Sequence, residues 1–141
     1  MINLIIGKKG NGKTSRMVDD LNDHAVDNAQ NVVCIERGKR LDRNVKYQIR
    51  LIDISEYPVT GYENLLSFIA GISAKDYDIT HLYIDSINKV AQTDSCAELE
   101  VFCEKLSDFL KEHPFTVNIL LSAERQELSE ALVSFVNLVE F

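Results

Sequence analysis

The chain has 141 residues, a formal net charge of −7 and a composition that is 45% hydrophobic and 26% charged. This length suits one domain, and the composition is that of a globular protein rather than of a disordered or fibrous chain. No stretch approaches the roughly 18 apolar residues of a membrane-spanning helix, so we expect no membrane insertion. The acidic charge argues against a general nucleic-acid binder, because affinity for a phosphate backbone needs a basic surface.

Hydrophobic periodicity predicts an alternation of strands and helices along the chain. The expected strands are 2–6, 31–35, 46–54, 81–87, 116–122 and a short 137–141, and the expected helices are 13–29, 62–73, 95–112 and 126–135. Continuous apolar strands that alternate with helices are typical of a mostly parallel sheet covered on both faces. The sequence therefore predicts an α/β fold, a three-layer α/β/α sandwich that forms one domain over residues 1–141.

Two features of the sequence bear on the cellular compartment of the protein. The apolar residues 2–7 have no basic region before them and no small-residue cleavage site after them, so we expect a cytoplasmic protein. Cys34, Cys96 and Cys103 are odd in number and lack the spacing of zinc ligands. We therefore expect reduced, structural cysteines.

A glycine-rich segment directly follows the first predicted strand and precedes the first predicted helix. Its sequence fits the pattern G-x-x-x-x-G-K-[ST] at every fixed position, and such loops turn their backbone N–H groups toward a polyphosphate. Lys13 is expected to reach the β- and γ-phosphates, and the hydroxyl of Thr14 to join the shell of Mg²⁺. The alternative is a glycine-rich turn with a helix-capping threonine. The expected nucleotide-binding residues are Gly7, Lys8, Lys9, Gly10, Asn11, Gly12, Lys13, Thr14 and Ser15.

A second acidic position lies at the end of the predicted strand 81–87. Asp85 follows four residues that read as a buried strand, and ligands collect at the carboxyl ends of strands in open α/β sheets. Asp85 is therefore expected to hold Mg²⁺ together with Thr14. Capping of the next helix by Asp85 is the alternative.

Together these residues resemble the RecA/KaiC-like branch of P-loop NTPases. The resemblance rests on the loop 7–14, on residues 32–36, on residues 84–87 and on residues 117–124. It implies binding of ATP and Mg²⁺, with Glu36 activating the attacking water and Ser122 sensing the γ-phosphate. The alternatives are an ion pair of Glu36 with Arg37 or Arg40 and capping of the following helix by Ser122.

The chain departs from this family in two places. Ser86 stands where many P-loop ATPases have a glutamate, which leaves Glu36 or Glu124 as the water-activating base. The segment 37–44 is too short and too polar for the helix that usually follows the second strand. The resemblance also predicts that the strand at 115–122 lies between the strands at 2–6 and 82–85. In most nucleoside-type kinases, by contrast, the strands at 2–6 and 82–85 are neighbours.

The segment 37–50 is strongly basic, with six Lys and Arg against one Asp. It can supply an arginine to a neighbour's nucleotide, bind nucleic acid or an acidic partner, or form a solvated loop that balances the acidic remainder. Tyr47 is its only aromatic residue. Because base stacking needs aromatic side chains, nucleic acid is the less favoured partner.

Three functions are consistent with this pattern. The first is a weak Mg²⁺-dependent ATPase or ATP-driven switch that acts with a protein partner or as a homo-oligomer, in which Lys13, Glu36 and Ser122 take part in catalysis. The others are a small-molecule kinase and a nucleotide-binding module that regulates a partner without hydrolysis. ATP is favoured over GTP because the sequence contains no Asn-Lys-x-Asp segment, the guanine-reading signature of GTPases.

Overall fold

The structure is a computed structural model, and it describes residues 1–76 and 78–141. Within these residues, six strands form one sheet, and five α-helices and two short 3-10 helices connect them. In chain order the elements are β1 (Ile2–Gly7), α1 (Lys13–Ala25), β2 (Val32–Glu36), β3 (Arg50–Asp53), η1 (Ile54–Glu56), α2 (Gly61–Lys75), β4 (His81–Ile84), α3 (Ile87–Ala91), α4 (Cys96–Glu112), β5 (Thr116–Ser122), η2 (Arg125–Glu127), α5 (Glu130–Phe135) and β6 (Asn137–Glu140).

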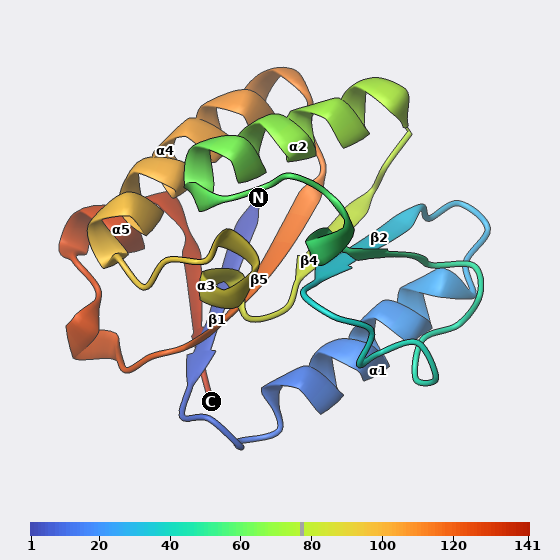
Figure 1. The fold of residues 1–141 in the computed structure, drawn as a ribbon, viewed down its shortest axis with the longest axis horizontal. Coiled ribbons are helices and arrows are strands. Elements are labelled where there is room, and N and C mark those ends of the chain that lie inside the picture. The colour runs from blue at the N-terminus through green and yellow to red at the C-terminus, as the bar shows by residue number, and fades with distance from the viewer. Residues whose placement is uncertain (77) are drawn as a thin grey trace.

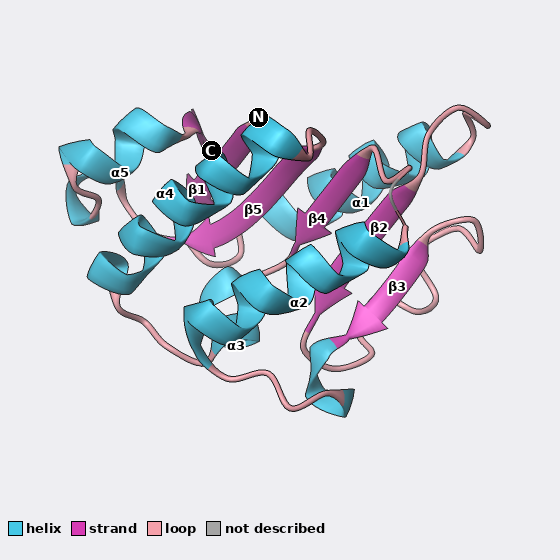
Figure 2. Ribbon diagram, turned by 90° about the horizontal axis from the view of Figure 1, so that it is seen from above, coloured by secondary structure: helices cyan, strands magenta, loops and turns pink. Residues whose placement is uncertain are grey.

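The strands lie in the order β3-β2-β4-β5-β1-β6, and all neighbouring strands run parallel. β5 therefore lies between β1 and β4, as the sequence predicted. Because the strands are parallel, their carboxyl ends share one edge of the sheet, and the loops that follow β1, β2, β4 and β5 meet there (Figure 2). This edge is the usual place for ligands in such a sheet.

Helices cover both faces of the sheet, which gives the three layers that the sequence predicted (Figure 1). The larger core lies beneath α2, α4 and α5 and includes Leu65 of α2 and Phe102 of α4. The smaller core lies beneath α1 and joins Met17 and Leu21 to Tyr83 of β4. β2 is buried along its whole length, which fits a strand enclosed between two layers.

Side-chain caps explain where two helices begin. Ser95 precedes α4 and accepts a hydrogen bond from the backbone N–H of Glu98 at 3.1 Å. Ser129 precedes α5 and accepts one from the N–H of Leu132 at 3.0 Å. Serine suits this position because its oxygen replaces a partner that the first N–H groups of a helix lack.

Several predicted boundaries were wrong. The helix expected over 13–29 ends at Ala25, because Asp27 forms a local turn and accepts a hydrogen bond from the N–H of Ala29. The strand expected over 46–54 is formed only by Arg50–Asp53 at the edge of the sheet. Residues 46–49 instead close a turn, in which the N–H of Ile49 binds the carbonyl of Lys46.

Two later elements also differ from the prediction. The strand expected over 81–87 ends at Ile84, since Ser86 has a φ of 54° and the short helix α3 follows. The helix expected over 126–135 is divided into η2 and α5, because Ser129 has extended backbone and starts a new helix. None of the described helices is both long and apolar enough to cross a membrane.

Candidate functional site

The glycine-rich loop joins β1 to α1 at the carboxyl edge of the sheet. Gly10 and Gly12 have φ values of 86° and 81°, in the left-handed region that favours glycine. Gly12 is also the residue that precedes α1, so the free N–H groups at the start of that helix face the loop. The sequence pattern and the backbone thus agree on a loop whose amides can surround an anion.

Lys13 lies against its own loop. It is 8% exposed, and its Nζ donates hydrogen bonds to the carbonyl oxygens of Gly7 at 3.1 Å and Lys8 at 2.8 Å. Burial lowers the pKa of Lys13, while the nearby carboxylate of Asp85 acts in the opposite direction. The ammonium is therefore a sheltered donor beside the backbone amides of the loop.

Thr14 and Asp85 lie side by side although 71 positions separate them. Asp85 directly follows β4 and is only 2% exposed. Its Oδ1 accepts hydrogen bonds from the hydroxyls of Thr14 at 3.2 Å and Ser86 at 3.3 Å, and its Oδ2 lies 3.7 Å from a guanidinium nitrogen of Arg40. The fold thus brings together the two residues that the sequence assigned to Mg²⁺, and each offers an oxygen atom as a metal ligand.

Glu36 ends β2 and is completely buried. Its two carboxylate oxygens accept hydrogen bonds from the backbone N–H groups of Arg40 at 3.3 Å and Leu41 at 3.2 Å. Burial raises the pKa of Glu36, which those two N–H groups and Arg40 counteract. Glu36 therefore holds the start of the basic segment in place, and both of its oxygens have partners.

The ion pair that the sequence offered as an alternative for Glu36 is absent among the described residues. The side chain of Arg37 instead donates to the carbonyl oxygens of Lys89 at 2.8 Å and Val90 at 3.3 Å, at the end of α3. That of Arg40 contacts Asp85. Among the residues that the structure describes, only the backbone of this loop donates hydrogen bonds to the Glu36 carboxylate.

Ser122 ends β5 and is exposed. It pairs in register with Gly7 of β1, so it lies beside the first residue of the glycine-rich loop. The alternative role as a helix cap was wrong, because η2 is preceded by Glu124 and α5 by Ser129. Glu124 forms a capping box with Glu127, whose carboxylate accepts from the N–H of Glu124 at 2.8 Å.

The basic segment is largely engaged within the chain. Besides Arg37 and Arg40, Lys39 pairs with Glu56 at 3.4 Å and Arg50 pairs with Asp76. Four of its six cations therefore contact groups of the same molecule in the described structure, which favours a structural role for much of this charge. Tyr47 points outward and is 93% exposed.

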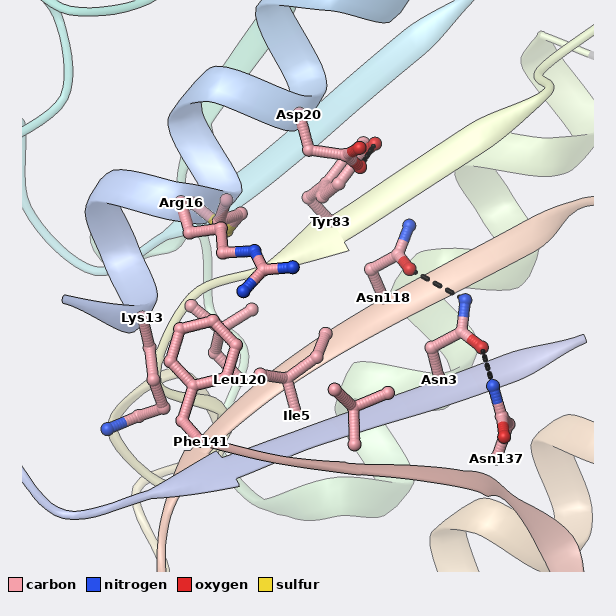
Figure 3. Close-up of a pocket in the computed structure, with 12 residues that line it drawn as sticks. Asn3, Ile5, Lys13, Arg16, Asp20, Tyr83, Asn118, Leu120, Asn137 and Phe141 are labelled. Atoms are coloured by element: carbon pink, nitrogen blue, oxygen red, sulfur yellow. Dashed lines mark hydrogen bonds between the residues drawn. The ribbon is translucent and has the colours of Figure 1, made fainter. Parts of the chain in front are cut away.

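A cavity that the sequence did not predict lies on the face of the sheet that carries α1 (Figure 3). It extends from Lys13 and Arg16 of α1 along β1, β5 and β6, and Phe141 closes one side. Two asparagines in otherwise apolar strands, Asn3 and Asn118, were the available signal. Polar side chains at matching places in neighbouring buried strands suggest a polar pocket rather than a core.

Comparison with protein-family models gave no match to this chain. No curated protein matches it either.

Proposed function

We propose that the chain is a P-loop protein of the RecA-like branch that binds ATP with Mg²⁺ and acts as a slowly hydrolysing switch. One observation carries this proposal. The complete motif lies between β1 and α1 with Lys13 turned toward its backbone, while Thr14 lies 3.2 Å from the carboxylate of Asp85. A glycine-rich loop at the start of a helix, a sheltered cation and an adjacent pair of oxygen ligands together suit a polyphosphate and its metal ion.

The donor set at Thr14 and Asp85 fits Mg²⁺. This ion prefers oxygen ligands and usually binds proteins through one or two side chains, with phosphate oxygens and waters completing its shell. The hydroxyl of Thr14 and the carboxylate of Asp85 would hold it, and the ion would neutralise charge on the β- and γ-phosphates. Lys13 would exchange its two carbonyl partners for phosphate oxygens, which form stronger, charge-assisted hydrogen bonds.

The strand order supports the RecA-like branch over the small-molecule kinase. β5 separates β1 from β4, whereas these two strands are expected to be neighbours in most nucleoside-type kinases. Ser122 is exposed and lies beside Gly7 in the register, which supports the expectation that it contacts the γ-phosphate. We retain the kinase only as the less favoured interpretation.

The surroundings of Glu36 favour slow hydrolysis. A water-activating base must lie within hydrogen-bond reach of the attacking water, whereas the Glu36 carboxylate is completely buried and already accepts two backbone N–H groups. Activation of water by Glu36 would require this buried carboxylate to become accessible to water, for example when a partner or a second copy of the chain binds. A module that binds ATP without hydrolysis is the limiting case of this proposal.

Binding of Mg²⁺-ATP, measured by titration calorimetry, tests the first part. We expect Lys13→Ala to weaken binding by at least about tenfold, which corresponds to about 1.4 kcal/mol, while Lys105→Ala retains wild-type affinity because Lys105 is exposed on α4. Thr14→Ala and Asp85→Asn should reduce the gain in affinity that Mg²⁺ provides. Equal affinity of wild type and Lys13→Ala would overturn the proposal.

Phosphate release at several protein concentrations tests the second part. Release that rises more than proportionally with concentration and is lost in Glu36→Gln would support an ATPase activated by self-assembly. Binding without release from any variant would support the regulatory module. Turnover by dilute protein at about 10 per second, a typical enzyme rate, would contradict the slow switch.

A further inference from the structure

The cavity described above begins at the candidate phosphate loop. Its volume is about 340 Å³, within the range of roughly 300–1,000 Å³ that is typical of small-molecule sites. Lys13 belongs both to the loop and to the wall of this cavity. A ligand held by the loop could therefore extend into the cavity past the side chains of Arg16 and Phe141.

The outer part of the cavity is aromatic and cationic. Phe141 follows β6 and lies so close to the loop that a Cβ placed on Gly7 would come within 3.0 Å of its own Cβ. The guanidinium carbon of Arg16 lies 4.9 Å from the centre of the Phe141 ring (Figure 3). Because Arg16 is exposed, a flat group could displace its guanidinium and stack on the ring in its place.

The inner part has an apolar floor and a polar end. Ile5, Leu120 and Val139 form one row across β5, β1 and β6. In the next such row, Asn3 donates to Asn118 at 2.8 Å and accepts from Asn137 at 3.0 Å.

Asn118 retains a free donor at this polar end. It is only 8% exposed, and its Nδ2 has no partner among the described residues. Figure 3 shows that nitrogen turned away from Asn3, into the cavity. A ligand with hydrogen-bond acceptors on its far edge would match this arrangement.

The loop has two chemically different sides. Thr14 faces Asp85 at the end of β4, whereas Phe141 lies beyond β1 at the end of β6, and the order β4-β5-β1-β6 keeps these positions apart. A triphosphate whose metal ion lies beside Asp85 would leave the loop toward Phe141. The side of the loop near Phe141, opposite Thr14 and Asp85, is thus the side that can receive a nucleoside.

We propose that this cavity is the base subsite, in which the purine ring of a nucleoside triphosphate stacks on Phe141 beneath Arg16 with its edge toward Asn118. The inference rests on the proposed nucleotide function and adds the residues that hold the base. Stacking tolerates any base, because every base has an aromatic face. Discrimination between bases therefore falls to the asparagine row at the inner end.

The test compares Mg²⁺-ATP with inorganic tripolyphosphate, which has the phosphates but no base. We expect Phe141→Ala to weaken ATP binding by about 5- to 150-fold, the range for loss of one base–aromatic stack, while tripolyphosphate binds as it does to wild type. Arg16→Ala should act in the same direction. Tyr47→Ala removes an aromatic ring that is 93% exposed and lies outside the cavity. This control variant should therefore bind Mg²⁺-ATP and tripolyphosphate with wild-type affinity.

The outcomes separate this inference from the proposed function. If Phe141→Ala and Arg16→Ala leave the ratio of the two affinities unchanged, the base subsite is wrong while the phosphate site stands. If wild type binds neither ligand, or if Lys13→Ala affects neither, the proposed function fails and the subsite with it. Phe141→Leu, which keeps an apolar side chain against Gly7, guards against a folding defect and should lower only the affinity for ATP.

Discussion

The guanidinium of Arg40 lies 3.7 Å from the carboxylate of Asp85, and the two side chains differ sharply in exposure. The Arg40 side chain is more than half exposed, whereas that of Asp85 is almost completely buried. A buried carboxylate needs hydrogen bonds or a counter-charge, since water no longer solvates it. Among the described residues, Arg40 is the only cation that forms an ion pair with this carboxylate, and it does so from the surface.

Loss of that counter-charge should destabilise the fold. We predict that Arg40→Ala lowers the free energy of unfolding by about 1 kcal/mol, a modest loss because solvent screens the exposed guanidinium. Urea unfolding measures this change. Arg43→Ala, at an exposed position of the same segment, should stay within about 0.5 kcal/mol of wild type. Equal stability of the two variants would show that Asp85 does not depend on Arg40.

Glu36 should give the stability a specific dependence on pH. Burial raises its folded-state pKa above the ordinary value of 4.5, so the folded state binds the proton more tightly than the unfolded state. The resulting stabilisation is complete below pH 4.5 and is lost as the pH rises through the raised pKa. Glu36→Gln cannot titrate, so wild type should lose stability relative to this variant as the pH increases.

Urea unfolding of wild type and Glu36→Gln at intervals from about pH 4 to about pH 8 measures that difference across the usual range of carboxyl titration. Glu104→Gln, an exposed position on α4, serves as the control and should not reproduce the trend. A stability difference between wild type and Glu36→Gln that is constant with pH would contradict the assignment.

The three free cysteines should react at different rates. Burial raises the pKa of Cys103 to about 12, and it also raises the pKa of the buried Cys34. Because the thiolate is the reactive form, we expect only the half-buried Cys96 to react readily with an aromatic disulfide reagent in the native protein. Unfolding in urea should expose all three thiols. Rapid native reaction that persists in Cys96→Ser would contradict this prediction.

Two glycine substitutions should have opposite effects. Gly71 is exposed within α2, and a Cβ added there meets no atom within 4 Å. Gly71→Ala should therefore raise the free energy of unfolding by about 0.5–1 kcal/mol. Gly12 has a φ of 81°, in the left-handed region that disfavours a Cβ. Gly12→Ala should therefore lower the free energy of unfolding by about 1–2 kcal/mol. Thermal unfolding tests both signs, and destabilisation by Gly71→Ala would be the contrary result.

The sequence predicted the three layers, the parallel sheet and the proximity of Thr14 to Asp85, because each depends on periodicity or on the ends of strands. It could not predict the partners of Glu36, since these depend on the path of the backbone through Arg40 and Leu41. The position of Phe141 beside Gly7 was also hidden, because the contact joins opposite ends of the chain. Short-range patterns carry no information about such pairs.

The place of β1 between β5 and β6 has a consequence for the order of folding. β1 pairs only with β5 and β6, which are the last two strands in the described chain. During synthesis the glycine-rich loop is made long before β5, so the strand that supports it has no neighbour in the described sheet until Thr116 and the residues after it have been made. Such long-range pairing is slow because a large loop must close before it forms. A ribosome-bound chain that stops before β5 should therefore lack the proposed phosphate site, although it already contains the entire motif.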